Sequence, residues 1–307
     1  MQKEVEAILN HIKRITQLRV SKFVLPIGAL LIAMISLQSG ASLAKGLFPL
    51  VGAPGVTSLR LGIGAFILLF IFKPWRIRFP RGDRMALFLY AFALGGMNFL
   101  FYFSLKKLPL GVAVALEFTG PLAVVMFSSR RIVDFVWLGF AILGLWLLLP
   151  LHQKTGGVDL FSAACALAAG ACWALYIIFG QKTGVHHGPG AVSVGSLIAA
   201  CLFCPIGIID NGMALCSSEV LPFGIAIAIL SSVVPFSLEM VALTRLPART
   251  FGTLMSLEPA FGALSGVVFL NEYLTGVQWF GLAAIICASI GATLSIKPKV
   301  ELQELNS

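Results

Sequence analysis

Charged residues are scarce in this sequence, and their scarcity excludes an ordinary soluble domain. Asp, Glu, Lys and Arg make up 11% of the 307 residues, whereas hydrophobic residues make up 58%. Soluble domains contain about 25% charged and about 45–50% apolar residues. The composition therefore predicts a polytopic membrane protein. The net charge of +9 does not indicate nucleic-acid binding, because the basic residues lie in short loops between apolar runs.

The motifs of common enzyme chemistry are also missing. The sequence has no nucleotide-binding loop, zinc motif, catalytic triad or haem motif, and its four histidines lie outside the apolar runs. Cys201 and Cys204 form a C-x-x-C inside an apolar run, without a nearby His or acidic cluster. Small packed side chains are the favoured interpretation there. We predict no enzyme activity, no metal and no cofactor.

Ten apolar segments follow a basic stretch of 22 residues. A membrane-spanning helix needs roughly 20 mostly apolar residues, and the second segment is short. The expected spans are 24–43, 56–72, 85–105, 108–127, 133–150, 160–180, 190–209, 221–243, 250–270 and 275–296. Residues 1–22 place apolar side chains at helical spacing, which fits either an amphipathic helix on the membrane surface or a flexible basic tail.

The distribution of basic residues predicts the orientation in the membrane. Cytoplasmic loops carry an excess of Lys and Arg. With a cytoplasmic N-terminus, only five of the 22 Lys and Arg residues fall outside: Lys45, Arg60, Lys106, Lys107 and Lys154. Both termini are therefore expected in the cytoplasm, although the pair at 106 and 107 opposes the trend.

The sequence contains an internal repeat. At one constant offset the aligned pairs are LKKLP at 105–109 with LTRLP at 243–247, Pro121 with Pro259, and Asp134 with Glu272. A repeat of five helices has an odd number of spans, so its second copy inserts upside down, as in many secondary transporters. We predict an all-α fold of ten transmembrane helices as two inverted five-helix repeats. The expected segments are 1–22, 23–151, 152–296 and a cytoplasmic tail at 297–307.

Residues 108–127 form a span with Glu117 near its middle. A charged side chain at the bilayer centre costs about 2.5–3.5 kcal/mol on insertion scales. Pro121 has no N–H, so the carbonyl of Glu117 loses its helical partner. Broken backbone at membrane depth is tolerated where it is buried in protein or lines a watery cavity. We interpret Glu117 as facing a transport pathway; the alternative is a protonated structural group.

Other polar residues inside the spans are candidates for the same pathway. Glu117 aligns with Met255 in the repeat, and Glu258 stands one helical turn later, on the same face. Glu239 lies about one turn from the cytoplasmic end of its span, so its carboxylate either functions or reaches the interface. Arg60, near the outer end of the second segment, is expected to reach the headgroups. The candidate binding residues are Glu117, Glu258, Gln38, Asn98, Tyr102 and Tyr176.

Five stretches of the sequence carry a family resemblance. They are GASLAKGLFPLVGAPGVTSLRL (40–61), GGMNFLFY (95–102), PLGVAVALEFTGPLAVVMFSSRR (109–131), GACWALYI (170–177) and SLEMVALTRLPARTFGTLMSLEPA (237–260). They resemble the bacterial inner-membrane threonine and homoserine exporters, in the EamA-type branch of the drug/metabolite transporter superfamily. The resemblance runs through all ten spans but not through residues 1–22. It implies two inverted five-helix repeats and export of threonine, homoserine and related small amino acids by proton exchange.

The polar residues fit such a substrate chemically. Glu117 or Glu258 could accept the ammonium of a zwitterionic amino acid, and Gln38, Asn98 and Tyr102 could donate to its carboxylate. A carboxyl group in a low-dielectric cavity holds a proton more readily than one in water. Proton and ammonium would then compete at Glu117 or Glu258, which is a route to antiport.

Two rival functions remain open at this point. An apolar cavity lined by some of the 24 Phe would favour a broader metabolite or drug exporter. The rival of another class is a non-transporting membrane scaffold or a polytopic membrane enzyme. The expected partners are a small amino acid, protons and membrane lipid, with no nucleic acid, and the oligomeric state is unknown.

Overall fold

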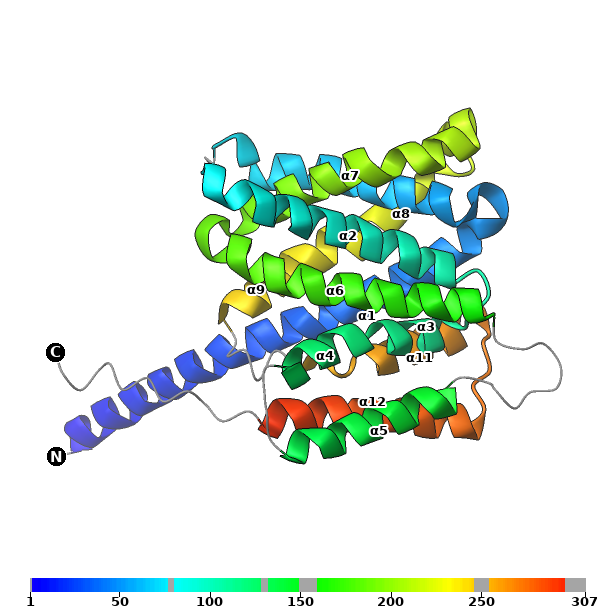
Figure 1. Ribbon diagram of the computed structural model, residues 1–307. Helices are drawn as coiled ribbons and strands as arrows, with labels where there is room; N and C mark the ends of the chain where they lie inside the picture. The colour runs from blue at the N-terminus through cyan, green and yellow to red at the C-terminus, as the bar shows by residue number, and fades with distance from the viewer. Residues whose placement is uncertain (1, 77–79, 128–131, 149–158, 246–253, 296–307) are drawn as a thin grey trace.

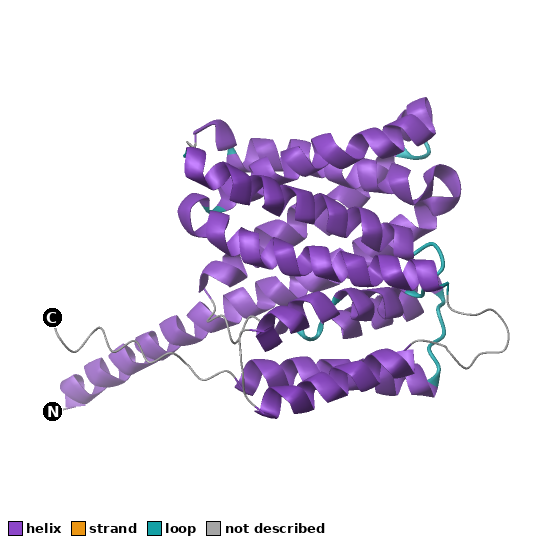
Figure 2. Cartoon of the chain, viewed as in Figure 1, coloured by secondary structure: helices purple, strands orange, loops and turns teal. Residues whose placement is uncertain are grey.

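The computed structural model describes residues 2–76, 80–127, 132–148, 159–245 and 254–295, and within these ranges every regular element is a helix (Figure 2). The long helices lie side by side in one bundle (Figure 1). The main helices are α1 (Gln2–Phe72), α2 (Arg84–Ser104), α3 (Leu110–Glu117), α4 (Thr119–Phe127), α5 (Ile132–Leu148), α6 (Leu160–His187), α7 (Pro189–Asn211), α8 (Leu221–Ala228), α9 (Val234–Arg245), α11 (Glu258–Leu270) and α12 (Gly276–Ser295). The short ones are η1 (Pro74–Arg76), η2 (Arg81–Asp83), η3 (Gly212–Cys216) and a π-helical turn, η4 (Ile229–Val233).

The outer surface of this bundle confirms a polytopic membrane protein. Five segments are long and apolar enough to cross a membrane: Val24–Phe72, Arg84–Ser104, Leu160–Gly180, Gly190–Cys216 and Leu221–Glu239. Large apolar side chains such as Phe66, Phe161 and Phe280 are exposed. A soluble protein rarely exposes large contiguous apolar patches, whereas hydrocarbon accepts them.

The first helix is bent, because α1 consists of two helices that meet at Gly52. The backbone there has φ 62° and ψ 175°, which glycine adopts without a Cβ clash. Residues 44–55, which connect the expected spans 24–43 and 56–72, are thus mostly helical and contain the bend. The segment Val24–Phe72 has 49 residues, roughly 70 Å of helix, or more than twice the hydrocarbon thickness of about 30 Å.

The structure describes the N-terminal end of the chain from residue 2 but not the C-terminal end beyond residue 295. The backbone is helical from Gln2 and continues directly into the first span. This N-terminal part of α1 projects from the bundle in Figure 1. The expected tail at 297–307 lies outside the described residues.

The break predicted beside Glu117 is present. Helix α3 ends at Glu117 and α4 begins at Thr119, since Pro121 cannot donate to the Glu117 carbonyl. Helix α6 packs against this turn backbone to backbone: a Cβ at Gly170 would lie 2.5 Å from the Glu117 carbonyl oxygen. The irregular turn is therefore buried in protein, as broken backbone in a membrane must be.

One end of the bundle is tied by a partly buried ion pair. Lys45 Nζ on α1 lies 2.5 Å from a carboxylate oxygen of Glu272, just after α11. The same ammonium donates to the Leu108 carbonyl oxygen at 2.8 Å, and the Leu110 N–H donates to Glu272 at 2.7 Å. These bonds join α1, the start of α3 and the segment after α11 at one point.

The close contact between α4 and α6 leaves no room for a methyl group at Gly120. A Cβ at Gly120 would overlap the Gly170 carbonyl oxygen, and backbone cannot move aside as a side chain can. Gly120→Ala should destabilise the protein by about 1–3 kcal/mol or more through overpacking, seen as a lower melting temperature of purified protein. Gly139→Ala is the control, because a Cβ at Gly139 meets nothing within 4 Å. Equal melting temperatures for both variants would contradict the contact.

Candidate functional site

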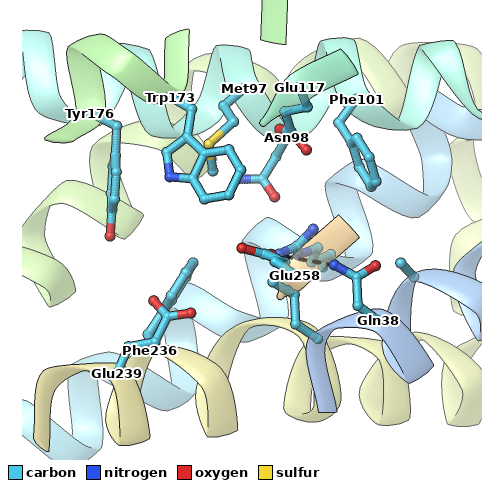
Figure 3. A pocket seen from close by; sticks show the side chains of 13 residues that line it. Gln38, Met97, Asn98, Phe101, Glu117, Trp173, Tyr176, Phe236, Glu239 and Glu258 are labelled. Carbon is cyan, nitrogen blue, oxygen red and sulfur yellow. Dashed lines mark hydrogen bonds between the residues drawn. The ribbon is translucent and has the colours of Figure 1, made fainter. Parts of the chain in front are cut away.

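A narrow cavity of about 60 Å³ lies inside the bundle, among α1, α2, α3, α6, α9 and α11 (Figure 3). Its lining combines apolar, amide, carboxyl and guanidinium side chains. The lining residues are Leu37, Gln38, Ala41, Arg60, Met97, Asn98, Phe101, Glu117, Trp173, Tyr176, Phe236, Glu239 and Glu258. Sites for drug-sized ligands are much larger, about 300–1,000 Å³, so the volume favours a small ligand.

Five of the six predicted binding residues line this cavity together. They are Glu117, Glu258, Gln38, Asn98 and Tyr176. Tyr102 is fully buried and is not among the lining residues; its hydroxyl oxygen accepts a hydrogen bond from Arg60 Nη1 at 3.2 Å. Tyr102 therefore contacts a lining residue, while the other five candidates contact the space itself.

Carboxyl groups from three helices meet at the cavity. Glu117 ends α3, Glu258 begins α11, and Glu239 comes from α9. Glu117 and Glu258 are 8% and 3% exposed, and Glu258 is within electrostatic reach of both other carboxyl groups. Carboxylates that share a site cannot all ionise without a cation beside them. The cluster can thus take up either a proton or a positively charged ligand group.

Glu258 has an incomplete set of hydrogen bonds. Gln38 Nε2 donates to its Oε1 at 3.3 Å. Among the described residues, Oε2 of Glu258 and Oε1 of Gln38 are buried without a hydrogen-bond partner. An unpartnered buried acceptor costs about 1–3 kcal/mol. Both atoms lie on cavity-lining residues, where a ligand donor or a proton would satisfy them.

Glu239 is half-buried and lines the cavity opposite Tyr176 in Figure 3. The π-helical turn η4 and Pro235 precede it in the same span. A π turn shifts the helical register. A regular α-helix drawn through this span from the sequence alone would therefore put the Glu239 side chain on the wrong face.

Arg60 is the main residue that the sequence analysis misplaced. It was expected to reach the headgroups, but it is 4% exposed and lines the cavity. The reason is that the second half of α1, which begins at Gly52, packs closely against η4. A Cβ at Gly64 would lie 3.1 Å from Ser232 Cβ. The small residues around Arg60 in the stretch GVTSLRLGIG were the available signal that protein, not lipid, surrounds it.

Three neighbours hold the Arg60 side chain in place. Its Nε donates to Ser232 Oγ at 3.1 Å, and its Nη2 donates to the Ser231 carbonyl oxygen at 2.5 Å. The third is the bond to Tyr102, whose ring centroid lies 5.3 Å from the guanidinium carbon. The arrangement links α1, α2 and η4. The described residues contain no cluster of His, Cys, Asp and Glu arranged to hold a metal ion.

Known proteins resemble this chain over most of its length. The sequence model of the EamA-like transporter family matches residues 160–294. The threonine/homoserine exporter RhtA of Salmonella typhimurium strain LT2 is 61% identical over 282 residues, 92% of this chain and 96% of its own. RhtA of Escherichia coli K12 is 60% identical with the same coverage.

Two more distant relatives agree in class or in fold. The uncharacterized transporter YwfM of Bacillus subtilis is 28% identical over 48% of this chain and 49% of its own. A solved crystal structure with 20% identity covers 87% of this chain and 97% of its own with a TM-score of 0.62, which supports the fold alone. RhtA and YwfM are both named as transporters. This chain belongs to the EamA-like transporter family, together with the RhtA threonine/homoserine exporters.

Proposed function

We propose that this protein is a secondary transporter of the bacterial inner membrane that exports threonine, homoserine and related small amino acids. The observation that carries the proposal is the 61% identity to an RhtA exporter over 92% of the chain. The cavity supports it independently, because its small volume and its carboxyl groups suit a small ligand with an ammonium group. A second pocket of about 590 Å³ is larger and mostly apolar, with Phe223 and Phe269 in its lining, but none of its lining residues has a carboxyl group that could bind an ammonium.

The proposed architecture has ten transmembrane helices in two inverted five-helix repeats, 23–151 and 152–296. Segments 1–22 and 297–307 flank them. Two similarities between the halves support it: α4 carries Pro121 in its first turn and α11 carries Pro259 in its first turn, and each follows or contains a cavity glutamate. The family match at 160–294 falls within the second repeat.

The proposed coupling is proton antiport, with Glu117 and Glu258 as the groups that exchange ammonium for a proton. Both are buried, lie within electrostatic reach of one another, and come from corresponding breaks of the two repeats. A carboxyl group in this environment is stable with either a proton or a cation, but costly as a bare anion. Release of the substrate ammonium therefore favours binding of a proton, and the reverse.

The direct test of function is uptake of radiolabelled threonine into inside-out membrane vesicles. We expect saturable uptake that an acidic lumen accelerates, because protons then leave as threonine enters. A protonophore should abolish this acceleration, because it dissipates the pH gradient. Uptake at the same rate with and without a pH gradient would be compatible with export but would contradict proton antiport. If vesicles that contain the inserted protein take up no more threonine than empty vesicles, the proposed export function is contradicted.

Glu117→Gln keeps the size and hydrogen bonding of the side chain but removes titration. Since a charge-assisted bond is worth about 1.5–3 kcal/mol, we expect pH-driven export per inserted molecule to fall about 10- to 100-fold, with downhill exchange partly retained. Exposed Glu219→Gln is the control and should export normally. Full pH-driven export by Glu117→Gln would make this residue structural and leave Glu258 as the proton site.

The topology is testable with reporter fusions at Ser307 and within η3, Gly212–Cys216. Ten spans with cytoplasmic termini place these two positions on opposite sides of the membrane. An enzyme active only in the cytoplasm should work at Ser307 and fail in η3, and one active only in the periplasm should do the reverse. The same compartment for both positions would be incompatible with the proposed architecture.

A further inference from the structure

We infer that the Arg60 guanidinium binds the carboxylate of the transported amino acid and thereby selects amino acids over plain amines. The inference rests on the proposed function, because it assigns the group that recognises one end of that substrate. Arg60 is a buried cation that lines the same cavity as the three glutamates.

The contacts of Arg60 leave its charge without a contacting anion. Its three hydrogen bonds go to neutral acceptors, the Ser232 and Tyr102 hydroxyls and the Ser231 carbonyl. A guanidinium has five N–H donors, so these bonds do not exhaust its capacity. Burying a cation costs several kcal/mol unless an anion and hydrogen bonds compensate.

The carboxyl groups of the cavity stand apart from Arg60. Between described residues the ion pairs within 4 Å are Lys45 with Glu272 and Lys107 with Asp159. Arg60 interacts with Glu117 and Glu239 across the cavity through its electric field, without such a contact. Among the described residues, Arg60 therefore forms no ion pair within 4 Å with a cavity glutamate, although its charge acts on two of them.

A zwitterionic amino acid fits this separation of charge. Its ammonium suits the glutamates, and its carboxylate suits a guanidinium, which binds carboxylates through two parallel N–H···O bonds. The bonds from η4 and α2 fix the guanidinium before the ligand arrives, which lowers the entropy cost of binding. Arg60 adds a full positive charge to the amide and hydroxyl donors expected from the sequence, and Tyr102 acts through Arg60 as a positioning residue.

The test compares threonine with threonine amide, which has the same shape and ammonium but no carboxylate. Binding to purified full-length protein is measured as ligand-dependent change in melting temperature. We expect wild-type protein to prefer threonine about 10- to 100-fold, the value of a charge-assisted bond. Arg60→Gln should weaken threonine binding by a similar factor without weakening amide binding, because the amide has no carboxylate and removal of Arg60 takes away a like charge. Arg60→Lys keeps the positive charge but cannot form two parallel N–H···O bonds, so its threonine affinity should lie between those of wild type and Arg60→Gln. Arg84 is exposed, so Arg84→Gln should match wild type.

Several outcomes would overturn the inference. Equal wild-type affinity for the two ligands would do so, as would an intact preference in Arg60→Gln. If Arg60→Gln weakens the binding of threonine and of threonine amide equally, Arg60 only holds Tyr102 and η4 in position. If Arg60→Gln does not fold, Arg60→Lys decides, because it must lose threonine affinity selectively. Wild-type protein that binds neither ligand would remove the proposed function together with the inference, whereas the other outcomes leave export standing.

Discussion

The cost of burying charge inside a bundle that faces hydrocarbon governs this structure. Each ionisable group at membrane depth needs a partner, a proton or a ligand, because water is absent. Glu117, Glu258 and Arg60 are all less than a tenth exposed and all line one cavity. Three irregular backbone features lie beside them: the break between α3 and α4, the start of α11 and the π turn η4.

The polar contacts of α1 connect the two proposed halves of the chain. Gln38 bonds to Glu258, Lys45 to Glu272, and Arg60 to Ser231 and Ser232. In each pair one partner precedes residue 152 and the other follows it. Helix α1 therefore bridges the seam in which the cavity lies. In a transporter built from two repeats, alternating access moves one half against the other around the site. Such motion must exchange these α1 contacts, and the one with Glu258 lies in the cavity itself.

Much of this arrangement was predictable from the sequence, and the failures have a common cause. Glu117 and Pro121 are separated by one helical turn, so a local rule about proline and helix carbonyls was enough to predict the break and the buried carboxylate. Arg60 was misplaced because its surroundings come from η4, far away in the sequence. The bend at Gly52 falls between the expected spans 24–43 and 56–72, but the sequence did not show that the connecting residues are mostly helical. Interactions between residues close in the sequence could be predicted, whereas helix register and the neighbours brought together by folding could not.

The packing around the cavity limits the size of the substrate as much as the charges determine its type. A Cβ at Gly262 would lie 2.9 Å from Val114 Cγ2 and 3.3 Å from Gln38 Oε1, so α11 approaches α3 and α1 with no room for a larger residue. Phe101, Trp173 and Phe236 add rigid aromatic walls. Charge recognition at both ends of an amino acid would accept any side chain, because all amino acids share the ammonium and carboxylate. Selection of small amino acids must therefore come from these walls, by exclusion of larger side chains, and a cavity of about 60 Å³ is consistent with that division of tasks.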